Sequence, residues 1–242
     1  MTKSLATVSI VVPTLNEATR IEPCLRRLRS DFPGCELVVV DGGSTDGTVE
    51  IAQRHAYTIC SAAGRAIQMN AGAAVSSGDV FWFIHADCQV SPGALNLLRQ
   101  ALLDPQVVGG GLQLSFDQRS LGLDYLAATS NVRARRLNWI FGDQAMFVRR
   151  EVFEAVRGFP LLPLMEDLEM SRILRRRGRL VVLPTTVTAS ARRLVEQGVW
   201  RMTVLMQVLK LQYLLGVDPE RIRQCYEAGT RRGRRRRPTP TG

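Results

Sequence analysis

The stretch LVVVDGGSTDG, residues 37–47, is a valine-rich apolar run that ends in an aspartate and a glycine-rich turn. A similar unit precedes it, because the run VSIVVP at 8–13 leads through polar residues into helically spaced apolar residues that stop at 33–34. Helical spacing also follows the second run, over 49–55. Two consecutive strand–loop–helix units of this kind predict a parallel β-sheet.

The same alternation continues beyond these two units. We expect strands at 57–60 and 80–84, separated by a helix of small residues over 66–75. Strands that are apolar on both sides need a sheet covered on both faces, and such sheets bind ligands beyond the carboxyl ends of their strands. Asp41 and Asp87, each just after a strand, would share that edge.

The second half of the chain is expected to be α+β, because its strands are separated less regularly and are interrupted by glycine and proline. The segments predicted to be helices are 92–103, 121–137 and 166–177, and those predicted to be strands are 107–116, 145–148 and 180–189.

These patterns divide the chain into three parts. We expect an α/β domain over 1–190, a helical extension over 191–228 and a disordered, arginine-rich tail over 229–242. Within the extension, residues 199–215 are mostly apolar but contain charged residues, and they are too few for a confident membrane span. We expect an amphipathic helix there, either packed on the domain or lying on a membrane surface.

The composition indicates a soluble globular protein. Apolar residues make up 45% of the 242 residues and charged residues 22%, which argues against disorder and against a multi-span membrane protein. The net charge of +10 predicts anionic partners, and six arginines at 231–237 supply much of it. They favour contact with an anionic membrane or non-specific nucleic-acid binding.

The five cysteines lack metal-ligand spacing, and no signal-peptide pattern precedes the first strand. We therefore expect a reducing, cytoplasmic location, with peripheral contact at the inner face of the membrane as the alternative that the arginines leave open.

The two strand-end aspartates are the first candidates for function. A carboxylate at the end of a buried strand is costly to desolvate unless it binds something, although a turn or helix cap would also use Asp41. A carboxylate beside an anionic diphosphate requires a divalent cation, and oxygen ligands suit Mg²⁺ or Mn²⁺.

Four motifs occur in a fixed order along the chain: VVPTLNE at 11–17, VVDGGSTDG at 39–47, HAD at 85–87 and ED at 166–167. In this order and spacing the sequence resembles the family 2 glycosyltransferases over roughly residues 7–190. The resemblance implies a GT-A, Rossmann-like α/β fold whose mainly parallel sheet is flanked by helices. It also implies a nucleotide-sugar donor.

Matching positions to the family's motifs implies which residues contact this donor. Asp41 would accept a hydrogen bond from the base, and Arg65, at the start of a helix, would pair with a phosphate unless it is a plain surface arginine. The residues that the resemblance assigns to the nucleotide sugar are Pro13, Leu15, Glu17, Asp41, Ser44, Arg65, Gln68, His85, Ala86, Asp143 and Gln144.

The resemblance also implies which residues bind the metal and which residue acts as the general base. Asp87 matches the family's metal-binding carboxylate, but His85 stands where the family has a first acid, which predicts weaker metal binding or a merely packed histidine. Asp167, with Glu166 beside it, matches the general base that deprotonates the acceptor hydroxyl, so inversion is expected. Alternatively, the two acids only stabilise a helix N-terminus.

We therefore predict a metal-assisted, inverting transferase that moves one sugar, expected to be UDP-linked, to a small-molecule or lipid acceptor. The Gln-x-x-Arg-Trp motif of processive synthases is absent. The alternatives are a non-catalytic GT-A fold that only binds the donor and a basic nucleic-acid-binding protein, although no specific nucleic acid is expected. A dinucleotide-dependent oxidoreductase is disfavoured because no G-x-G-x-x-G follows the first strand.

Overall fold

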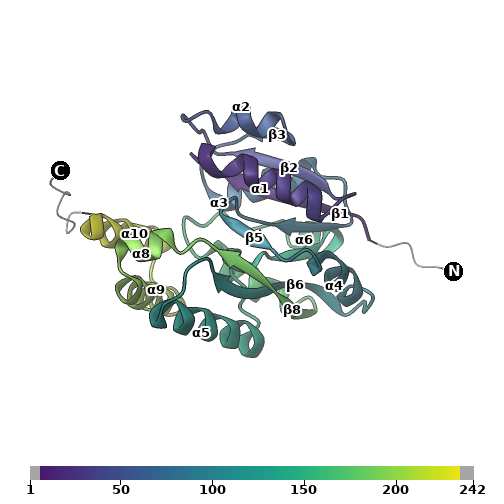
Figure 1. Cartoon of the computed structure of the whole chain (residues 1–242). Helices are drawn as coiled ribbons and strands as arrows, with labels where there is room; N and C mark the ends of the chain where they lie inside the picture. Colours follow the sequence, from purple (N-terminus) through teal and green to yellow (C-terminus); the bar gives the residue numbers. More distant parts are fainter. Residues whose placement is uncertain (1–5, 235–242) are drawn as a thin grey trace.

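Residues 6–234 are described by the computed structural model, in which one eight-stranded sheet runs through the chain (Figure 1). The strands are β1 (Val8–Thr14), β2 (Glu36–Asp41), β3 (Tyr57–Cys60), β4 (Val80–Phe83), β5 (Cys88–Val90), β6 (Val107–Phe116), β7 (Phe147–Arg149) and β8 (Arg179–Ala189). Their spatial order is β3-β2-β1-β4-β7-β6-β8-β5. The first four strands of this order pair in parallel, as do β6 and β8, whereas β7 and β5 pair antiparallel to their neighbours. The mainly parallel GT-A sheet is thus confirmed.

Helices cover both faces of the sheet. They are α1 (Ala18–Asp31), α2 (Thr48–Gln53), α3 (Arg65–Val75), α4 (Ala94–Ala101), α5 (Leu121–Leu137), α6 (Arg150–Ala155), α7 (Glu166–Leu174), α8 (Arg192–Gln197), α9 (Val199–Leu214) and α10 (Pro219–Arg234), with a short 3₁₀ turn, η1 (Gly142–Gln144). Side chains of α1, α2 and α4 pack with one face, and side chains of α3, α5, α6 and α7 pack with the other. The apolar runs read from the sequence therefore form strands that are buried on both sides.

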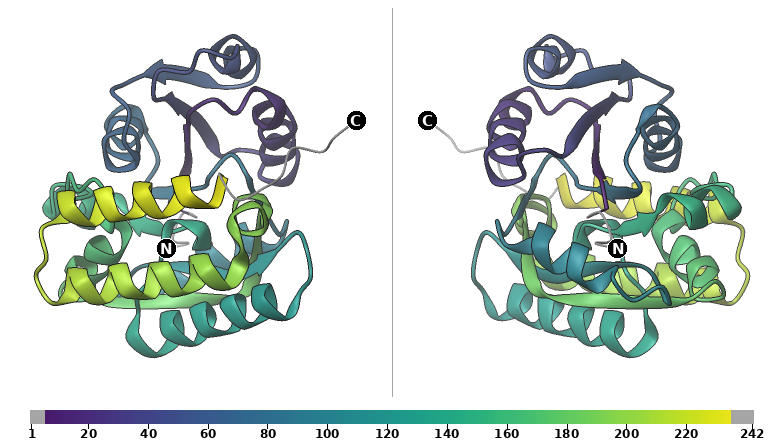
Figure 2. Two further views of the ribbon diagram at one scale, coloured as in Figure 1. Left: turned by 90° about the vertical axis from the view of Figure 1, so that its left-hand side faces the viewer. Right: turned by 90° about the vertical axis from the view of Figure 1, so that its right-hand side faces the viewer.

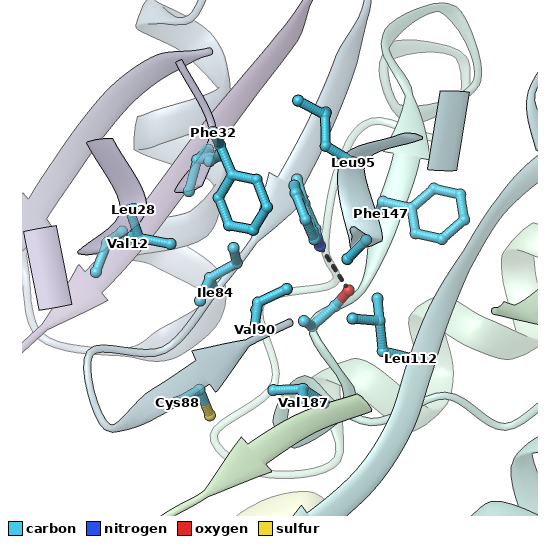
Figure 3. Close-up of a cluster of buried hydrophobic side chains, with 14 of the residues drawn as sticks. Val12, Leu28, Phe32, Ile84, Cys88, Val90, Leu95, Leu112, Phe147 and Val187 are labelled. Atoms are coloured by element: carbon cyan, nitrogen blue, oxygen red, sulfur yellow. Dashed lines mark hydrogen bonds between the residues drawn. The ribbon is translucent and has the colours of Figure 1, made fainter. Parts of the chain in front are cut away.

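The core on the first face joins the end of β4 to the turn η1. Figure 3 shows Val12, Leu28, Phe32 and Phe147 within this cluster, which combines side chains from α1, β1 and β7. Nearby, the buried Trp82 indole donates a hydrogen bond to the Ala145 carbonyl, at 3.0 Å. This bond fixes β4, which leads into the HAD motif, against the segment that follows η1.

The close packing of α3 against β1 depends on a glycine. A Cβ at Gly72 would lie 2.3 Å from Val11 Cγ1 and 2.9 Å from Val40 Cγ2, so only glycine allows this approach. As a consequence, the N-terminal part of α3 lies beside the carboxyl ends of β1 and β2.

The last three helices gather at one end of the molecule, next to α5 (Figure 1), and α9 and α10 run side by side in both views of Figure 2. Leu209 of α9 and Ile222 of α10 pack against Met165 and Leu168, at the start of α7. The expected packing of residues 199–215 on the domain is therefore confirmed. Its outer side still exposes Trp200 and other apolar side chains. No helix in residues 6–234 is long and apolar enough to cross a membrane.

Several local expectations differ from the structure. Strand β5 and helices α6 and α8 were not predicted, because each is only three to six residues long. The expected disorder from residue 229 is wrong up to Arg234, since α10 continues to that residue. The rest of the predicted tail, 235–242, lies outside the described residues.

Candidate active site

A cavity of about 260 Å³ lies beyond the carboxyl ends of β1 and β4, and we call it the strand-end cavity. Two of the four motifs, at 11–17 and 85–87, contribute to it together with the start of α3 and α8. The lining residues are Pro13, Thr14, Leu15, Glu17, Gly64, Arg65, Gln68, His85, Ala86, Asp87 and Arg193. Eight of the residues assigned from the sequence are among them, so distant segments predicted to bind one ligand do meet.

Three of the lining residues, Thr14, Gly64 and Arg193, were not assigned to the site from the sequence. The buried Thr14 hydroxyl has no hydrogen-bond partner in the part of the chain that the structure describes. Arg193 donates to Glu17 Oε1 at 3.3 Å, and Glu17 Oε2 accepts from Arg20 at 3.0 Å. An unpartnered buried hydroxyl facing a cavity is costly unless a ligand or water bonds to it. The sequence signals for Thr14 were its place at the end of the first strand and within the VVPTLNE motif.

Asp41 and Ser44 are absent from the lining of the strand-end cavity. Asp41 is fully buried, and its Oδ1 accepts hydrogen bonds from the backbone of Gly43 and Ser44 at 2.8 and 2.7 Å. The Ser44 hydroxyl donates to Asp41 Oδ2 and accepts from the Asn16 amide. The pair therefore ties together the loops after β1 and β2, and Asp41 could reach a base only if its loop opened.

Gln68 also holds backbone together. Its side-chain amide donates to the carbonyls of Thr14 and Val40, at 2.8 and 2.9 Å. These carbonyls lie near the ends of β1 and β2, so Gln68 fixes the two strand ends while forming part of the cavity wall. The sequence assigned it to the nucleotide sugar, but its amide nitrogen is already engaged.

His85 is a neutral residue in this environment. Burial, followed by the positive charge of Arg65, lowers the pKa of His85 to about 4, although Asp87 opposes the shift. His85 Nε2 faces the turn η1, since a Cβ at Gly142 would lie only 2.7 Å from it. A neutral imidazole can accept or donate a hydrogen bond or bind a metal, but it adds no charge to the site.

Asp167 lies at the N-terminus of α7 and contacts the turn η1. Its Oδ2 accepts a hydrogen bond from the Gly142 amide at 2.9 Å, and its Oδ1 accepts one from Leu168 at 2.7 Å. The cationic Arg65 interacts electrostatically with Asp167, with Glu166 and with Asp87. The predicted base and the predicted metal ligand therefore belong to one electrostatic cluster.

The two candidates in η1 have different roles. Gln144 is fully buried, accepts from Arg133 at 2.9 Å and donates to the Leu112 carbonyl at 3.2 Å. Its side-chain amide therefore holds the turn in place, and its assignment to the nucleotide sugar stays a prediction. Asp143, in contrast, has a buried Oδ1 without a hydrogen-bond partner among the described residues.

The carboxyl group of Asp143 takes up a proton more readily than usual. Burial raises the pKa of Asp143 to about 6; Arg133 opposes this, and Asp167 and Asp87 add to it. The negative charges of Asp143, Asp167 and Asp87 thus repel one another, and binding of a proton or a cation near them would reduce this repulsion. Asp143 remains a candidate for contact with the diphosphate or its cation.

Glu166 is buried beside Asp167, and it lines a second cavity, of about 550 Å³, together with Arg65, Arg193 and Tyr226. Burial, followed by the charge of Asp167, raises the pKa of Glu166 to about 7, with Arg65 acting in the opposite direction. This position suits a residue that orients Arg65, and the predicted part of Glu166 in catalysis stays a prediction.

The raised pKa of Glu166 predicts a pH-dependent stability. A carboxyl whose folded pKa exceeds its ordinary value of 4.5 stabilises the fold below that value, and this contribution is lost as the pH rises through about 7. In the Glu166→Gln variant we expect the melting temperature to fall less between about pH 5 and about pH 8 than in the wild type. The exposed Glu151→Gln should keep the wild-type slope. Equal slopes for Glu166→Gln and the wild type would contradict the assignment.

Comparison with known proteins agrees with this geometry. Residues 9–157 match the family model described as glycosyl transferase family 2. The chain belongs to glycosyl transferase family 2. The expectation drawn from the four motifs is therefore confirmed, and the strand-end cavity is the candidate active site of a family 2 glycosyltransferase.

Family 2 relatives extend beyond this chain. The glycosyltransferase AglE of Haloferax volcanii is 28% identical over 176 residues, which are 66% of this chain and 58% of AglE, so the chain spans less than two thirds of that protein. The mannosyltransferase PcManGT of Pyrobaculum calidifontis, solved with GDP-Man and Mn²⁺, superposes with a TM-score of 0.64 at 20% identity, over 98% of this chain and 78% of PcManGT. Glucosyl-3-phosphoglycerate synthase of Mycobacterium tuberculosis, solved with Mn²⁺, UDP and its product, gives 0.57 at 21%, over 76% of this chain and 70% of the synthase.

The residues of this family 2 site fit a metal ion that is held jointly by the protein and the donor diphosphate, rather than by protein side chains alone. Within residues 6–234, no group of three or more His, Cys, Asp and Glu side chains could hold an ion by itself. Mg²⁺ is commonly held by one or two carboxylates together with substrate phosphates. Asp87, with the unpartnered Asp143 oxygen nearby, matches that pattern and would need the donor diphosphate to complete it.

Proposed function

We propose that this family 2 chain transfers a single sugar, with inversion at the anomeric carbon, from a nucleotide diphosphate donor to an acceptor hydroxyl. The observation that carries the proposal is the strand-end cavity: Thr14, Arg65 and Asp87 line it, and Arg65 links it electrostatically to Asp167. A donor site and a carboxylate base are thereby brought within one cluster.

The donor would lie with its nucleotide against the loop after β1 and with its diphosphate near Arg65. Thr14 offers a buried hydroxyl without a partner among residues 6–234. Arg65 opens α3, so its guanidinium adds to the partial positive charge of a helix N-terminus, an arrangement that suits phosphate oxygens. The neutral His85 would hydrogen-bond a ribose or phosphate oxygen.

The transfer step uses the carboxylate of Asp167 as the general base. The acceptor oxygen forms a bond to the anomeric carbon, its proton passes to Asp167, and the bond from that carbon to the diphosphate breaks with the electron pair leaving on the diphosphate. Arg65 stabilises the charge that develops there. A divalent cation held by Asp87 would supply further positive charge at the same place.

Two structures of similar fold support a nucleotide donor and a divalent cation, since one was solved with GDP-Man and the other with UDP, both with Mn²⁺. They leave the nucleobase of the donor open, because one nucleotide carries guanine and the other uracil. We propose a UDP-linked sugar, with a GDP-linked sugar as the alternative, and Mn²⁺ or Mg²⁺ as the cation.

A panel of UDP- and GDP-linked sugars, assayed by thermal shift with and without Mn²⁺, tests the donor assignment. We expect one sugar nucleotide to stabilise the protein by about 2.7 kcal/mol at 100 times its Kd, and to do so only with the cation. Release of the nucleoside diphosphate from that donor should follow. Stabilisation by none of them would refute the proposal, and binding without any turnover would favour a non-catalytic fold.

A further inference from the structure

A third cavity, of about 430 Å³, lies between α5 and α9, and we call it the α5–α9 cavity. It shares no residue with the strand-end cavity. Helices α5 and α9 contact each other directly. The lining residues are Tyr125, Thr129, Ser130, Arg133, Leu137, Trp139, Gln207, Lys210, Leu211 and Leu214.

Two cationic side chains, Lys210 and Arg133, line this cavity, and neither forms an ion pair within residues 6–234. Lys210 is only 8% exposed, and it forms no ion pair within the part of the chain that the structure describes. Its Nζ lies 5.5 Å from the centre of the Phe141 ring, and the Arg133 guanidinium lies 3.6 Å from the same centre. The hydrogen bonds of Arg133 go to the uncharged Trp139 carbonyl and Gln144 amide. A buried cation is normally paired. Asp143 and Asp167 act on both side chains electrostatically, but within residues 6–234 neither side chain forms a direct ion pair.

The pKa of Lys210 also reflects the positive charge of Arg133 beside it. Burial, followed by the neighbouring charge of Arg133, lowers the pKa of Lys210 to about 8, while Asp143 and Asp167 oppose the shift. An anion bound beside Lys210 would relieve the repulsion between the two cations.

The α5–α9 cavity lies close to the reaction centre. Asp143 and Asp167 interact electrostatically with both Lys210 and Arg133. Asp143 and Asp167 also interact with Arg65, which lines the strand-end cavity. The turn η1 connects the two sides, since its Gly142 amide donates to Asp167 at 2.9 Å and its Gln144 side chain accepts from Arg133 at 2.9 Å. The proposed base and the wall of the α5–α9 cavity therefore contact the same short turn.

The outer wall of the cavity is apolar and reaches solvent. Leu211 is 57% exposed and Tyr125 52% exposed. Further along α9, the Trp200 ring lies 5.5 Å from the Tyr125 ring, and Val204 is also exposed. A continuous exposed apolar surface beside a polar cavity is typical of a binding site for an apolar chain.

We propose that the α5–α9 cavity is the acceptor site and that the acceptor is an amphiphile, with a phosphate at Lys210 and Arg133 and an apolar chain along α5 and α9. The paired guanidinium and ammonium groups suit phosphate oxygens, and the apolar wall accounts for the chain. A hydroxyl next to the phosphate would face Asp167. This inference rests on the proposed function, which supplies the base and the donor.

Three matched probes separate the parts of this acceptor: a short-chain lysophosphatidylglycerol, the monoacylglycerol with the same chain, and glycerol phosphate. Each is titrated below its micelle concentration, without donor, and binding is followed by tryptophan fluorescence, to which Trp139 in the cavity wall contributes. We expect the lysophospholipid to bind at least roughly tenfold more tightly than either fragment, because only it fills both the cationic and the apolar part.

Two variants test the residues, with a matched control. Lys210→Gln should weaken lysophosphatidylglycerol binding by roughly tenfold or more and leave monoacylglycerol binding unchanged. Leu211→Gln should weaken binding of both chain-bearing probes. Arg177→Gln, at an exposed position beyond the end of α7, should change neither. Circular dichroism checks that each variant folds. If Lys210→Gln does not fold, Leu211→Gln still tests the proposal.

The outcomes separate this inference from the proposed function. Equal binding of lysophosphatidylglycerol and monoacylglycerol would overturn the phosphate site, and equal binding of glycerol phosphate would show that a free phosphate ester is the ligand and overturn the apolar part. If no probe binds while a sugar nucleotide still stabilises the protein, the inference is wrong and the donor assignment stands. Probe binding that follows this pattern without any donor binding would support the cavity and refute the proposed function.

Discussion

Asp167→Asn should lower turnover of the donor identified by thermal shift by roughly 10²- to 10⁴-fold, because an amide cannot take up the proton of the acceptor hydroxyl. The substitution preserves size, and the asparagine oxygen can still accept the hydrogen bond that Gly142 gives Asp167 at 2.9 Å. The turn η1 should therefore keep its place, and stabilisation by the donor should persist. Steady-state release of nucleoside diphosphate measures turnover, and thermal shift measures binding.

A matched control removes a carboxylate elsewhere. Asp124 is exposed in the first turn of α5 and pairs with Arg119, so Asp124→Asn should leave turnover unchanged. If Asp167→Asn binds the donor and retains wild-type turnover, Asp167 is not the base. A combined loss of donor binding and turnover would assign it to holding the site together instead.

Much of the fold follows from local pattern. The predicted bounds of β3, β6 and α5 agree with the structure, because these segments carry clear apolar periodicity between polar or glycine-rich breaks. Strand β5, only three residues long, owes its existence to pairing with residues 187–189 of β8, about 100 residues further along the chain. No local signal encodes such pairing.

The sequence predicted where the candidate site lies better than it predicted what each polar side chain contacts. The family resemblance assigned Leu15, Arg65 and Asp87 to one site, and all three line the strand-end cavity because parallel strands end at one edge of the sheet. Residue type could not show whether a polar side chain faces a ligand or the backbone. Asp41 and Gln144 were assigned to the ligand for that reason, although both bind the loops around them.

Residues from the far end of the chain escaped prediction for another reason. Arg193 and Lys210 reach the two cavities only because α8 and α9 pack back against the domain. In the sequence they look like ordinary charges on an amphipathic segment. Their place depends on the packing of Leu209 and Ile222 against the start of α7, which no short window of sequence contains.

Asp87→Asn should lower turnover by roughly 100-fold, equivalent to about 3 kcal/mol, and should weaken the binding of Mn²⁺. Asp87 lines the strand-end cavity, and its charge reaches both Arg65 and Asp143. Without that charge, the diphosphate alone would have to hold the cation. A titration of turnover against Mn²⁺ concentration should show a higher half-saturation concentration as well as a lower maximum.

His85→Gln provides the comparison, because His85 occupies the same motif but is uncharged near neutral pH, its pKa being about 4. Losing a neutral ligand or hydrogen bond should cost less than losing a charge, so we expect a smaller fall in turnover and a smaller shift of the Mn²⁺ curve than for Asp87→Asn. If His85→Gln proves the more damaging of the two, the cation is held chiefly by the imidazole. The departure of this chain from an acid–x–acid motif would then mark a different metal site rather than a weaker one.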